Sequence, residues 1–191
     1  PVKGEILDLA EIVHVTYNPL IRAIRKIEKP VVCAVNGVAA GAGANLALAC
    51  DIVLASSEAS FIQSFAKIGL VPDSGGTFFL PRLAGLARAT AMAMLGEKIN
   101  AERAVEFGMI YRVCPPADLV AQALEIARSL ATMPTRALGL TKRALNQSFD
   151  NNLDAQLEVE EKLQGVAGKS ADFYEGVAAF LEKRKPNFTG E

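Results

Sequence analysis

Apolar and polar residues follow one another along the first half of this chain at two different spacings. Between residues 9 and 27 the apolar side chains return every three or four positions, which predicts an amphipathic helix that ends before Lys29-Pro30. The next run, residues 31–35, is wholly apolar and rich in β-branched side chains, as in a strand buried on both faces. Similar runs predict further strands over residues 51–55, 60–62 and 109–113.

Helical spacing accounts for most of the remaining chain. Before Pro115-Pro116 it predicts helices over residues 41–50, 75–83 (interrupted by Pro81), 88–95 and 101–107. After the two prolines every predicted element is a helix, over residues 117–131, 135–148, 153–167 and 171–185. This order predicts an α/β core over residues 1–116 and a helical region over residues 117–191 that covers the core or builds an oligomer.

Charge and composition exclude several classes of protein. The 191 residues are 51% hydrophobic, enough for a sizeable core, and 20 basic residues balance 21 acidic ones. A nucleic-acid-binding or polybasic membrane-binding protein would show a basic excess, and no apolar run is long enough to span a bilayer. Cys33, Cys50 and Cys114 have no metal-binding spacing, so we expect no metal site and free thiols in a reducing, cytoplasmic environment.

Asp73 is the most informative residue, because a proline, glycines and apolar residues surround it in the stretch 69–76. It is the only acidic residue between Glu58 and Glu97. A carboxylate short of water is suited to taking up and releasing protons, which makes Asp73 a candidate catalytic residue. The alternative is that Asp73 or Ser74 caps a helix that starts nearby, since buried functional acids and helix caps look alike in a sequence.

The stretch 36–45 is built almost entirely from glycine, alanine and asparagine. It is not a phosphate-binding P-loop because no Lys-Ser/Thr follows the glycines, and it lacks the third glycine of a dinucleotide-binding fingerprint. Two interpretations remain open: tight packing of a helix on a strand, or an oxyanion hole made of backbone amides.

Other polar candidates have structural explanations. His14, the only histidine, has no serine or cysteine partner in its predicted helix, which argues against a Ser-His-Asp hydrolase. Glu158, Glu160 and Glu161 form a solvated helix face. Residues 183–185, Lys-Arg-Lys, either complement the dipole at a helix C-terminus or anchor phosphates.

Motifs in a fixed order along nearly the whole chain resemble the enoyl-CoA hydratase/isomerase (crotonase) superfamily. They are the strand and loop 29–37, the small-residue helix before 50–53, the stretch 69–77 followed by 80–82, residues 101–110, and the end 175–184. The resemblance covers the family's middle and end. The family's first strands, with the other oxyanion amide and part of the coenzyme A site, are expected before Pro1.

The resemblance implies a spiral of ββα turns, a helical C-terminal region, and trimers that often pair as hexamers. It implies an acyl-CoA substrate and no cofactor beyond the coenzyme A that the substrate carries. By resemblance, the amide of Ala42 is the family's second oxyanion donor, and Phe180 and Lys183 contact the adenine and phosphates of coenzyme A, commonly from a neighbouring subunit. The substrate pocket is expected along Val38, Gly41, Asn45, Phe65 and Pro72.

Two departures from the family's pattern favour isomerisation over hydration. The glutamates with which the family's hydratases activate water are replaced here by Asn45 and Phe65. Asp73 stands where hydratases commonly have glycine and where certain isomerases place their acid. A single carboxylate can take a proton from one carbon and return it to another, in a dry site that needs no activated water.

Within the family, residues 35–43 and 72–77 and the end 184–190 look most like the ring-epoxide isomerases of bacterial phenylacetate breakdown, which also shift double bonds in unsaturated acyl-CoAs. The resulting hypothesis is an acyl-CoA isomerase in which Asp73 carries the proton. Two alternatives stay open: a hydratase or hydrolase that uses Asp73 on water, and a non-catalytic acyl-CoA-binding subunit in which the acid only caps a helix.

Overall fold

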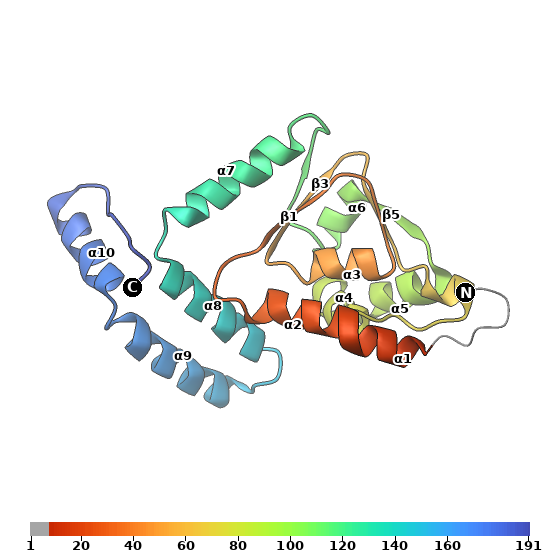
Figure 1. The fold of residues 1–191 in the computed structure, drawn as a ribbon, viewed down its shortest axis with the longest axis horizontal. Coiled ribbons are helices and arrows are strands. Elements are labelled where there is room, and N and C mark those ends of the chain that lie inside the picture. Colours follow the sequence, from red (N-terminus) through yellow and green to blue (C-terminus); the bar gives the residue numbers. More distant parts are fainter. Residues whose placement is uncertain (1–7) are drawn as a thin grey trace. The chain divides into compact units, whose positions relative to one another are not determined.

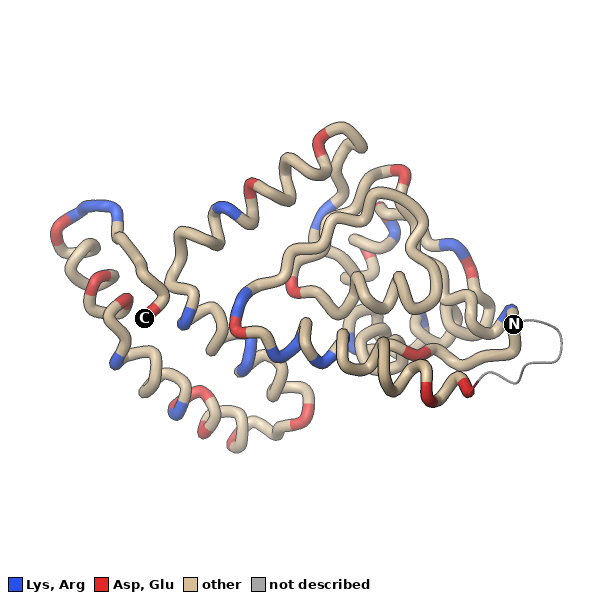
Figure 2. Tube along the Cα trace, viewed as in Figure 1, with Lys and Arg blue, Asp and Glu red and all other residues tan. Residues whose placement is uncertain are grey.

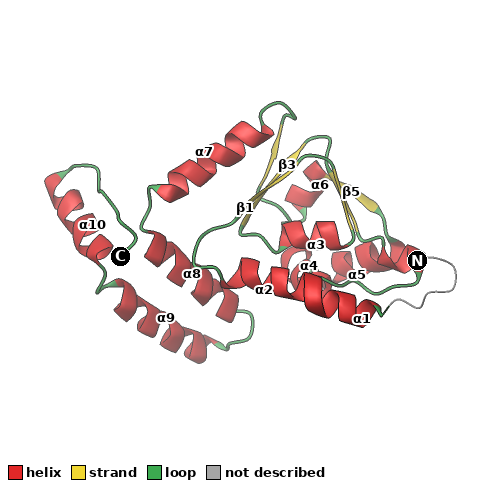
Figure 3. Ribbon diagram, in the orientation of Figure 1, coloured by secondary structure: helices red, strands yellow, loops and turns green. Residues whose placement is uncertain are grey.

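The computed structural model describes residues 8–191 (Figure 1). Its contacts divide the chain into two compact units, residues 8–25 with Val31–Ala123, and Lys26–Pro30 with Leu124–Glu191. The strands of the described residues all lie in the first unit, and the second is built from helices (Figure 3). The predicted α/β class with a helical C-terminal region is confirmed. The division between the units falls inside α7 (Leu119–Ala131).

Within residues 8–191, six short strands form two three-stranded sheets. One sheet is wholly parallel, in the order β1 (Val32–Val35), β3 (Ile52–Ser56), β6 (Arg112–Cys114). The other has the order β2 (Val38–Ala40), β4 (Ser60–Ile62), β5 (Lys98–Asn100), with β5 antiparallel to β4. The chain passes from β1 to β2 and then from β3 to β4, so each turn adds one strand to each sheet before helices follow. This is the predicted spiral of ββα turns.

The helices of the first unit agree closely with the predicted ones. The first helical stretch consists of α1 (Leu9–Ile12), a π-helical segment η1 (Val13–Tyr17) and α2 (Asn18–Lys26). Within it the N–H of Asn18 donates to the carbonyl of Val13, five residues back. The others are α3 (Ala42–Leu48), α4 (Gly76–Ala84), α5 (Leu86–Leu95) and α6 (Ala101–Glu106). The 3₁₀ segment η2 (Phe65–Ile68) was not predicted.

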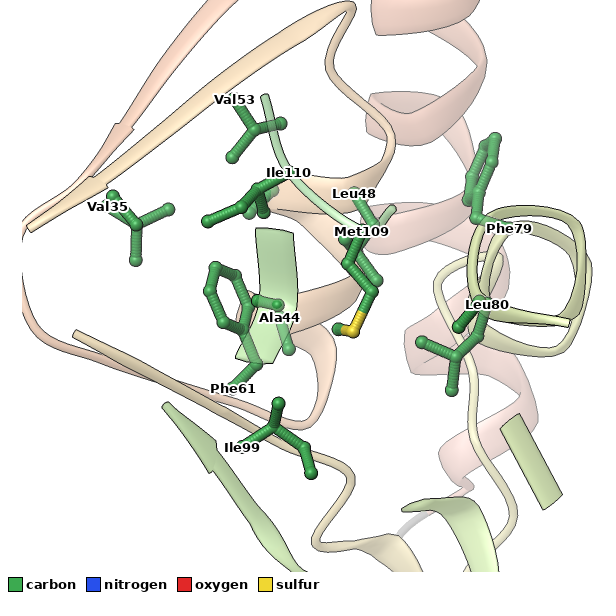
Figure 4. Close-up of a cluster of buried hydrophobic side chains, with 14 of the residues drawn as sticks. Val35, Ala44, Leu48, Val53, Phe61, Phe79, Leu80, Ile99, Met109 and Ile110 are labelled. Atoms are coloured by element: carbon green, nitrogen blue, oxygen red, sulfur yellow. The ribbon is translucent and has the colours of Figure 1, made fainter. Parts of the chain in front are cut away.

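The core of the first unit joins both sheets to α3, α4 and α6 (Figure 4). Phe61 of β4 and Ile99 of β5 are partners across the second sheet, and both are almost fully buried. Ala44 of α3 is also fully buried, and its small side chain lets the helix approach the strands closely. Burial of a side chain such as Phe61 stabilises the fold by about 1.5–3 kcal/mol.

One stretch of this core was predicted differently. The apolar run 109–113 was expected to be a strand, but pairing begins at Arg112. Met109 and Ile110 are buried by contacts with the core instead of by strand pairing.

Asp51 fixes the connection between α2, β1 and β3. Its Oδ1 accepts a hydrogen bond of 3.0 Å from Arg25, and its Oδ2 accepts one of 2.8 Å from the N–H of Val31. The same Arg25 nitrogen donates to the carbonyl of Ala49. The N-terminal ends of the two strands are thereby held together by one carboxylate, and the Arg25 bond to Ala49 ties the end of α3 to them.

The second unit contains α8 (Thr135–Gln147), α9 (Leu153–Ala167) and α10 (Ala171–Glu182) after the end of α7. Residues 26–30 join it through α8, because the ammonium of Lys142 donates to the carbonyl of Lys29 at 3.2 Å. Gly139 lies against the backbone of Glu28, where a Cβ atom would be too close to the Glu28 carbonyl oxygen. Charged residues are spread over both units, and α3 carries none (Figure 2).

The C-terminal tail folds back along α10. The carboxylate of Asp172, which is buried, accepts hydrogen bonds from the N–H groups of Thr189 and Gly190 at 2.7 and 2.9 Å. The helix was predicted to continue to residue 185, but it ends at Glu182 because Lys183 adopts a left-handed conformation with φ +54°. That turn reverses the chain and starts the tail.

Candidate active site

The first part of the site is the start of α3. Strand β2 leads into Gly41, whose N–H donates to the carbonyl of Ile62 on β4 at 2.8 Å. Gly41 has φ +54° and ψ −125°, a backbone conformation that side chains disfavour. The helix then begins at Ala42, and its first hydrogen bond of the helical kind runs from the N–H of Asn45 to the carbonyl of Gly41. The N–H of Ala42 therefore lies in the first turn, where backbone amides have no acceptor inside the helix.

The second part is the loop that carries Asp73. It begins at Gly69 (φ +73°) and ends with two consecutive left-handed residues, Ser74 (φ +50°) and Gly75 (φ +79°). The carbonyl of Asp73 accepts the N–H of Gly76 at 2.8 Å, which closes a tight turn into α4. A left-handed serine is uncommon and costs about 1–3 kcal/mol, so the surrounding structure must hold the turn in place.

Asp73 is partly exposed, and its carboxylate has a defined partner. The hydroxyl of the buried Ser74 donates to Oδ1 of Asp73 at 2.8 Å. The interpretation of Asp73 or Ser74 as a helix cap is wrong: the N-cap of α4 is Gly75, and within the described residues no side chain forms a cap hydrogen bond there. The Ser74 hydroxyl donates its hydrogen bond to Asp73 and does not bond to the start of the helix. The Asp73 carboxylate does not cap the helix either, so it is available for a catalytic role.

Asn45 connects the two parts. Its side-chain nitrogen donates to the carbonyl of Asp73 at 2.8 Å, and its side-chain oxygen accepts a hydrogen bond of 2.8 Å from Gln63. Asn45 has 0% of its surface exposed. It was predicted as a pocket residue, but a residue without exposed surface does not line an open pocket, and both ends of its amide are occupied by the protein.

Phe65 is buried as well. Its ring lies beside Gly41, where an added Cβ would be 3.5 Å from the ring edge. The two positions at which the resemblance places the hydratase glutamates are thus filled by a buried amide and a buried ring. Of the three positions compared, only Asp73 offers an acid, and it retains some exposure.

The remaining predicted pocket residues are placed differently. Val38 is exposed at the start of β2, and Gly41 is buried at its end. Pro72 lines an apolar cavity of about 410 Å³ together with Leu70, Thr77 and Met94, formed by η2, the Asp73 loop, α4 and α5. The cavity is thus lined by residues on both sides of Asp73 in the sequence, among them Pro72 and Gly76.

Phe180 and Lys183, the predicted coenzyme A contacts, belong to the second unit. Phe180 is 82% exposed on α10, beside the exposed Leu181. Lys183 follows three residues later, and its N–H donates to the carbonyl of Phe180. The two residues therefore lie at one end of α10.

Outside the site, the cysteines and the histidine have separate surroundings. A hydrogen bond from the Cys50 thiol lowers the pKa of Cys33, against the opposing effect of burial. Burial raises the pKa of Cys114. His14 is exposed on η1. Within residues 8–191 no group of three or more His, Cys, Asp or Glu side chains could hold a metal ion, and no helix is long and apolar enough to cross a membrane.

Two residues of the site could not be assigned from the sequence. Gln63 follows a predicted strand and looks like an ordinary polar residue, yet it is buried against Asn45. For Ser74 the sequence indicates only a helix cap, yet its hydroxyl donates to Asp73. In the sequence, this glutamine and this serine stand among apolar residues and glycines. That setting indicates that the two side chains are buried, but it does not identify the groups to which they form hydrogen bonds.

The same arrangement of sheets and helices recurs in solved structures. An enoyl-CoA hydratase from Bacillus anthracis is similar with a TM-score of 0.90 at 32% identity, over 97% of this chain and 72% of that chain. This likeness places the chain in the crotonase class of α/β folds.

Curated sequences agree. The chain is 54% identical, over 98% of its length and 72% of the relative's, to the 1,2-epoxyphenylacetyl-CoA isomerase of Escherichia coli K12. It is 38% identical, over 96% of its length and 72% of the relative's, to the 2,3-dehydroadipyl-CoA hydratase of the same organism. The sequence profile of the enoyl-CoA hydratase/isomerase family matches residues 3–191, and the chain belongs to this family.

Proposed function

We propose that this protein is an acyl-CoA isomerase in which Asp73 carries a proton between two carbons of the substrate. The proposal rests on the burial and chemistry of three side chains. Asn45 and Phe65 are buried and offer no acid, whereas Asp73 is partly exposed, is not a helix cap, and is attached through Asn45 to the helix that begins with Ala42. One acid beside a row of backbone amides fits an enolate reaction without activated water.

In the proposed reaction, the thioester oxygen accepts a hydrogen bond from the N–H of Ala42. The carboxylate of Asp73 removes a proton from the carbon next to the thioester carbonyl, and the electron pair moves into an enolate on that oxygen. The neutral Asp73 then returns the proton to the far carbon of the unsaturated system, and the double bond shifts. The substrate gains and loses no atoms and no electrons overall, so the reaction needs no water and no cofactor beyond coenzyme A. One such amide contributes about 3 kcal/mol to stabilising the enolate.

The similarity to the 1,2-epoxyphenylacetyl-CoA isomerase supports a substrate class. We propose thioesters that isomerise through an enolate: 1,2-epoxyphenylacetyl-CoA going to its seven-membered oxepin form, as a step in phenylacetate degradation, and 3-enoyl-CoAs going to 2-enoyl-CoAs. Phe180 and Lys183 are proposed to contact the adenine and phosphates, in a homotrimer or hexamer. The apolar cavity beside Pro72 is compatible with an apolar acyl group.

The test is an activity assay with the full chain. Incubation with a 3-enoyl-CoA should produce the ultraviolet absorbance of a conjugated thioester. Asp73→Asn should lower kcat about 100-fold or more, because it removes the base while an amide oxygen can still accept the Ser74 hydroxyl. The control is Asp154→Asn on exposed α9, which should keep full activity. Full activity in Asp73→Asn, with unchanged assembly, would contradict the proposal.

A second candidate is a hydratase that uses Asp73 on water, favoured by the similarity to the dehydroadipyl-CoA hydratase. A hydratase would incorporate an oxygen atom from water into its product, whereas the proposed isomerase would not. A reaction run in ¹⁸O-water should leave the isomerised product unlabelled if the first proposal is correct, and should label a hydroxyacyl product if the second is.

A further inference from the structure

A buried pair of amide side chains, Asn45 and Gln63, lies behind the proposed site. Gln63 donates to the oxygen of Asn45, and Asn45 donates to the backbone carbonyl of Asp73, both at 2.8 Å. The exposed fractions are 0% for Asn45 and 3% for Gln63. Because Asn45 has no exposed surface and Gln63 almost none, water has little access to replace these hydrogen bonds.

The position of Asn45 on α3 gives the pair its geometric effect. Asn45 is three residues after Ala42, so the two residues lie on the same side of the helix one turn apart. Its own N–H closes the first helical turn on Gly41. The side chain of Asn45 therefore ties the backbone of the acid to the same turn that presents the Ala42 amide.

The packing around the pair leaves it little freedom. A Cβ atom on Gly76 would collide with the Asn45 amide, so the start of α4 lies directly against it. Gln63 follows β4 and precedes η2, so its backbone is set by the second sheet. The orientation of Asn45 is thus fixed from one side by Gln63 and from the other by Gly76.

We propose that Asn45 and Gln63 are positioning residues, which hold the Asp73 loop at a fixed separation from the Ala42 amide and so set the rate of proton transfer. This inference rests on the proposed function. Displacement of a catalytic group by about 1 Å costs about 100-fold in rate, so a loosened loop should lower kcat with little change in KM. The acid would remain present but would lie too far from the carbon that it serves.

Two substitutions, Gln63→Met and Asn45→Leu, test the pair, and the first is designed to change the stability of the fold little. Gln63→Met keeps the size of the side chain, removes the donor to Asn45, and also removes a buried oxygen, Gln63 Oε1, that has no partner among the described residues. The substitution leaves Asn45 Oδ1 without its donor but removes the unpartnered Gln63 Oε1, so the number of unsatisfied buried oxygens in the pair is unchanged and the loss of stability should be about that of one hydrogen bond. Asn45→Leu removes the bond to Asp73 directly. The Asp73 carbonyl still keeps the N–H of Gly76.

The control is Ser60→Ala on β4. The Ser60 hydroxyl is also buried without a partner among the described residues, so its removal should not affect activity. We expect kcat to fall about 10- to 100-fold in Gln63→Met and Asn45→Leu, with KM within about twofold of the parent. Hydrogen exchange should become faster for the backbone amides of residues 70–77 in both variants, and should be unchanged in Ser60→Ala.

The outcomes separate the two proposals. Parental kcat and parental exchange rates in both variants would overturn the positioning role, while loss of activity in Asp73→Asn would leave the proposed function intact. Full activity in Asp73→Asn would overturn the proposed function and the catalytic role of the pair with it. A proportional loss of activity and of folded protein in both variants, with no local change in exchange, would assign the pair to general stability and would also overturn the proposal.

Discussion

The hydroxyl of Ser74 donates a hydrogen bond of 2.8 Å to the carboxylate of Asp73, and Ser74 holds a left-handed backbone conformation while doing so. Glycine would adopt the same conformation without strain. The hydroxyl therefore explains why a serine occupies this strained position, because a glycine at position 74 would leave the Asp73 carboxylate without this donor. The hydrogen bond also fixes the orientation of the acid, since Ser74 is buried and cannot turn toward solvent.

Removal of this hydroxyl should lower activity more than it lowers stability. Hydrogen bonds to charged groups contribute about 1.5–3 kcal/mol, so kcat of Ser74→Ala should fall by about tenfold or more if the carboxylate loses its orientation. Ser74→Gly is the matched variant. It loses the same hydroxyl but relieves the backbone, so it should be equally slow and about 1 kcal/mol more stable than Ser74→Ala in urea unfolding. Parental kcat in both variants would contradict this role.

Gly76 is a second position where the backbone cannot accept a side chain. A Cβ atom there would collide with Asn45, whose amide is held by hydrogen bonds at both ends. Gly76→Ala should lower the free energy of unfolding by about 1–3 kcal/mol and reduce the proposed activity, because Asn45 must move away from the Asp73 carbonyl. Gly165→Ala on α9 is the control. No atom lies within 4 Å of its added Cβ, and alanine should stabilise that helix.

Most elements of this fold could be predicted because each depends on local pattern. The first helical stretch, α9 and β4 were expected almost as observed. β2 and β5 were not expected, since each has three residues and exists because a neighbouring strand pairs with it. A three-residue strand leaves too short a pattern to identify, and the partner that stabilises it is distant in the sequence.

The site could be predicted in part for the same reason. Asp73 is a single acid in a distinctive local stretch, so the sequence alone identifies it as a candidate. The geometry of one turn, in which Gly75 is the N-cap of α4, then shows that Asp73 is not a helix cap. The link through Asn45 could not be predicted, because it joins residues 28 positions apart and is supported by Gln63, 18 positions from Asn45. A side-chain amide has no preferred partner in sequence, so only the fold brings these groups together.

Lys183 should contribute to coenzyme A affinity and little to folding. Substitution with glutamine removes the charge but keeps a Cβ, so the strain of the left-handed backbone at this position is unchanged. We expect Lys183→Gln to weaken coenzyme A binding about tenfold at low salt, measured by calorimetry, with the unfolding midpoint unchanged. Lys183→Arg should retain most of the affinity. Unchanged affinity of the glutamine variant at low salt would count against a contact with phosphate.

The cysteines should differ in reactivity. Thiolates are the nucleophilic form, so Cys33, whose pKa is lowered by Cys50, should react with iodoacetamide faster than Cys114, whose pKa is raised by burial. The Cys50 thiol also lies 3.4 Å from the carbonyl of Leu46, and its one proton can serve one acceptor at a time. Cys50→Ala should therefore slow alkylation of Cys33 and leave that of Cys114 unchanged, as mass spectrometry of the labelled peptides would report. An equal rate at Cys33 with and without Cys50 would refute this.

The tail that follows Lys183 depends on a carboxylate at the middle of α10. Glu175 accepts two hydrogen bonds from Arg184, at 2.7 and 2.9 Å, and one from the N–H of Asn187. The Arg184 hydrogen bonds, followed by that of Asn187, lower the pKa of Glu175 from 4.5 to about 2. The unfolded chain therefore binds the proton more readily than the folded tail does, and the stabilising effect of Glu175 is complete above pH 4.5.

Acid should release the tail within a defined range of pH. As the pH falls from 4.5 toward 2, Glu175 gains a proton in the unfolded state first, and its contribution to stability decreases until it is absent below the folded pKa. Glu175→Gln should be less stable than the parent at pH 7, and the difference should shrink progressively over this range. Urea unfolding at several pH values measures the difference directly, with Glu158→Gln as a control on exposed α9. A difference that stays constant between pH 7 and pH 3 would mean that the charge of Glu175 does not hold the tail, and that the hydrogen bonds which the Asp172 carboxylate accepts from the N–H groups of Thr189 and Gly190 suffice.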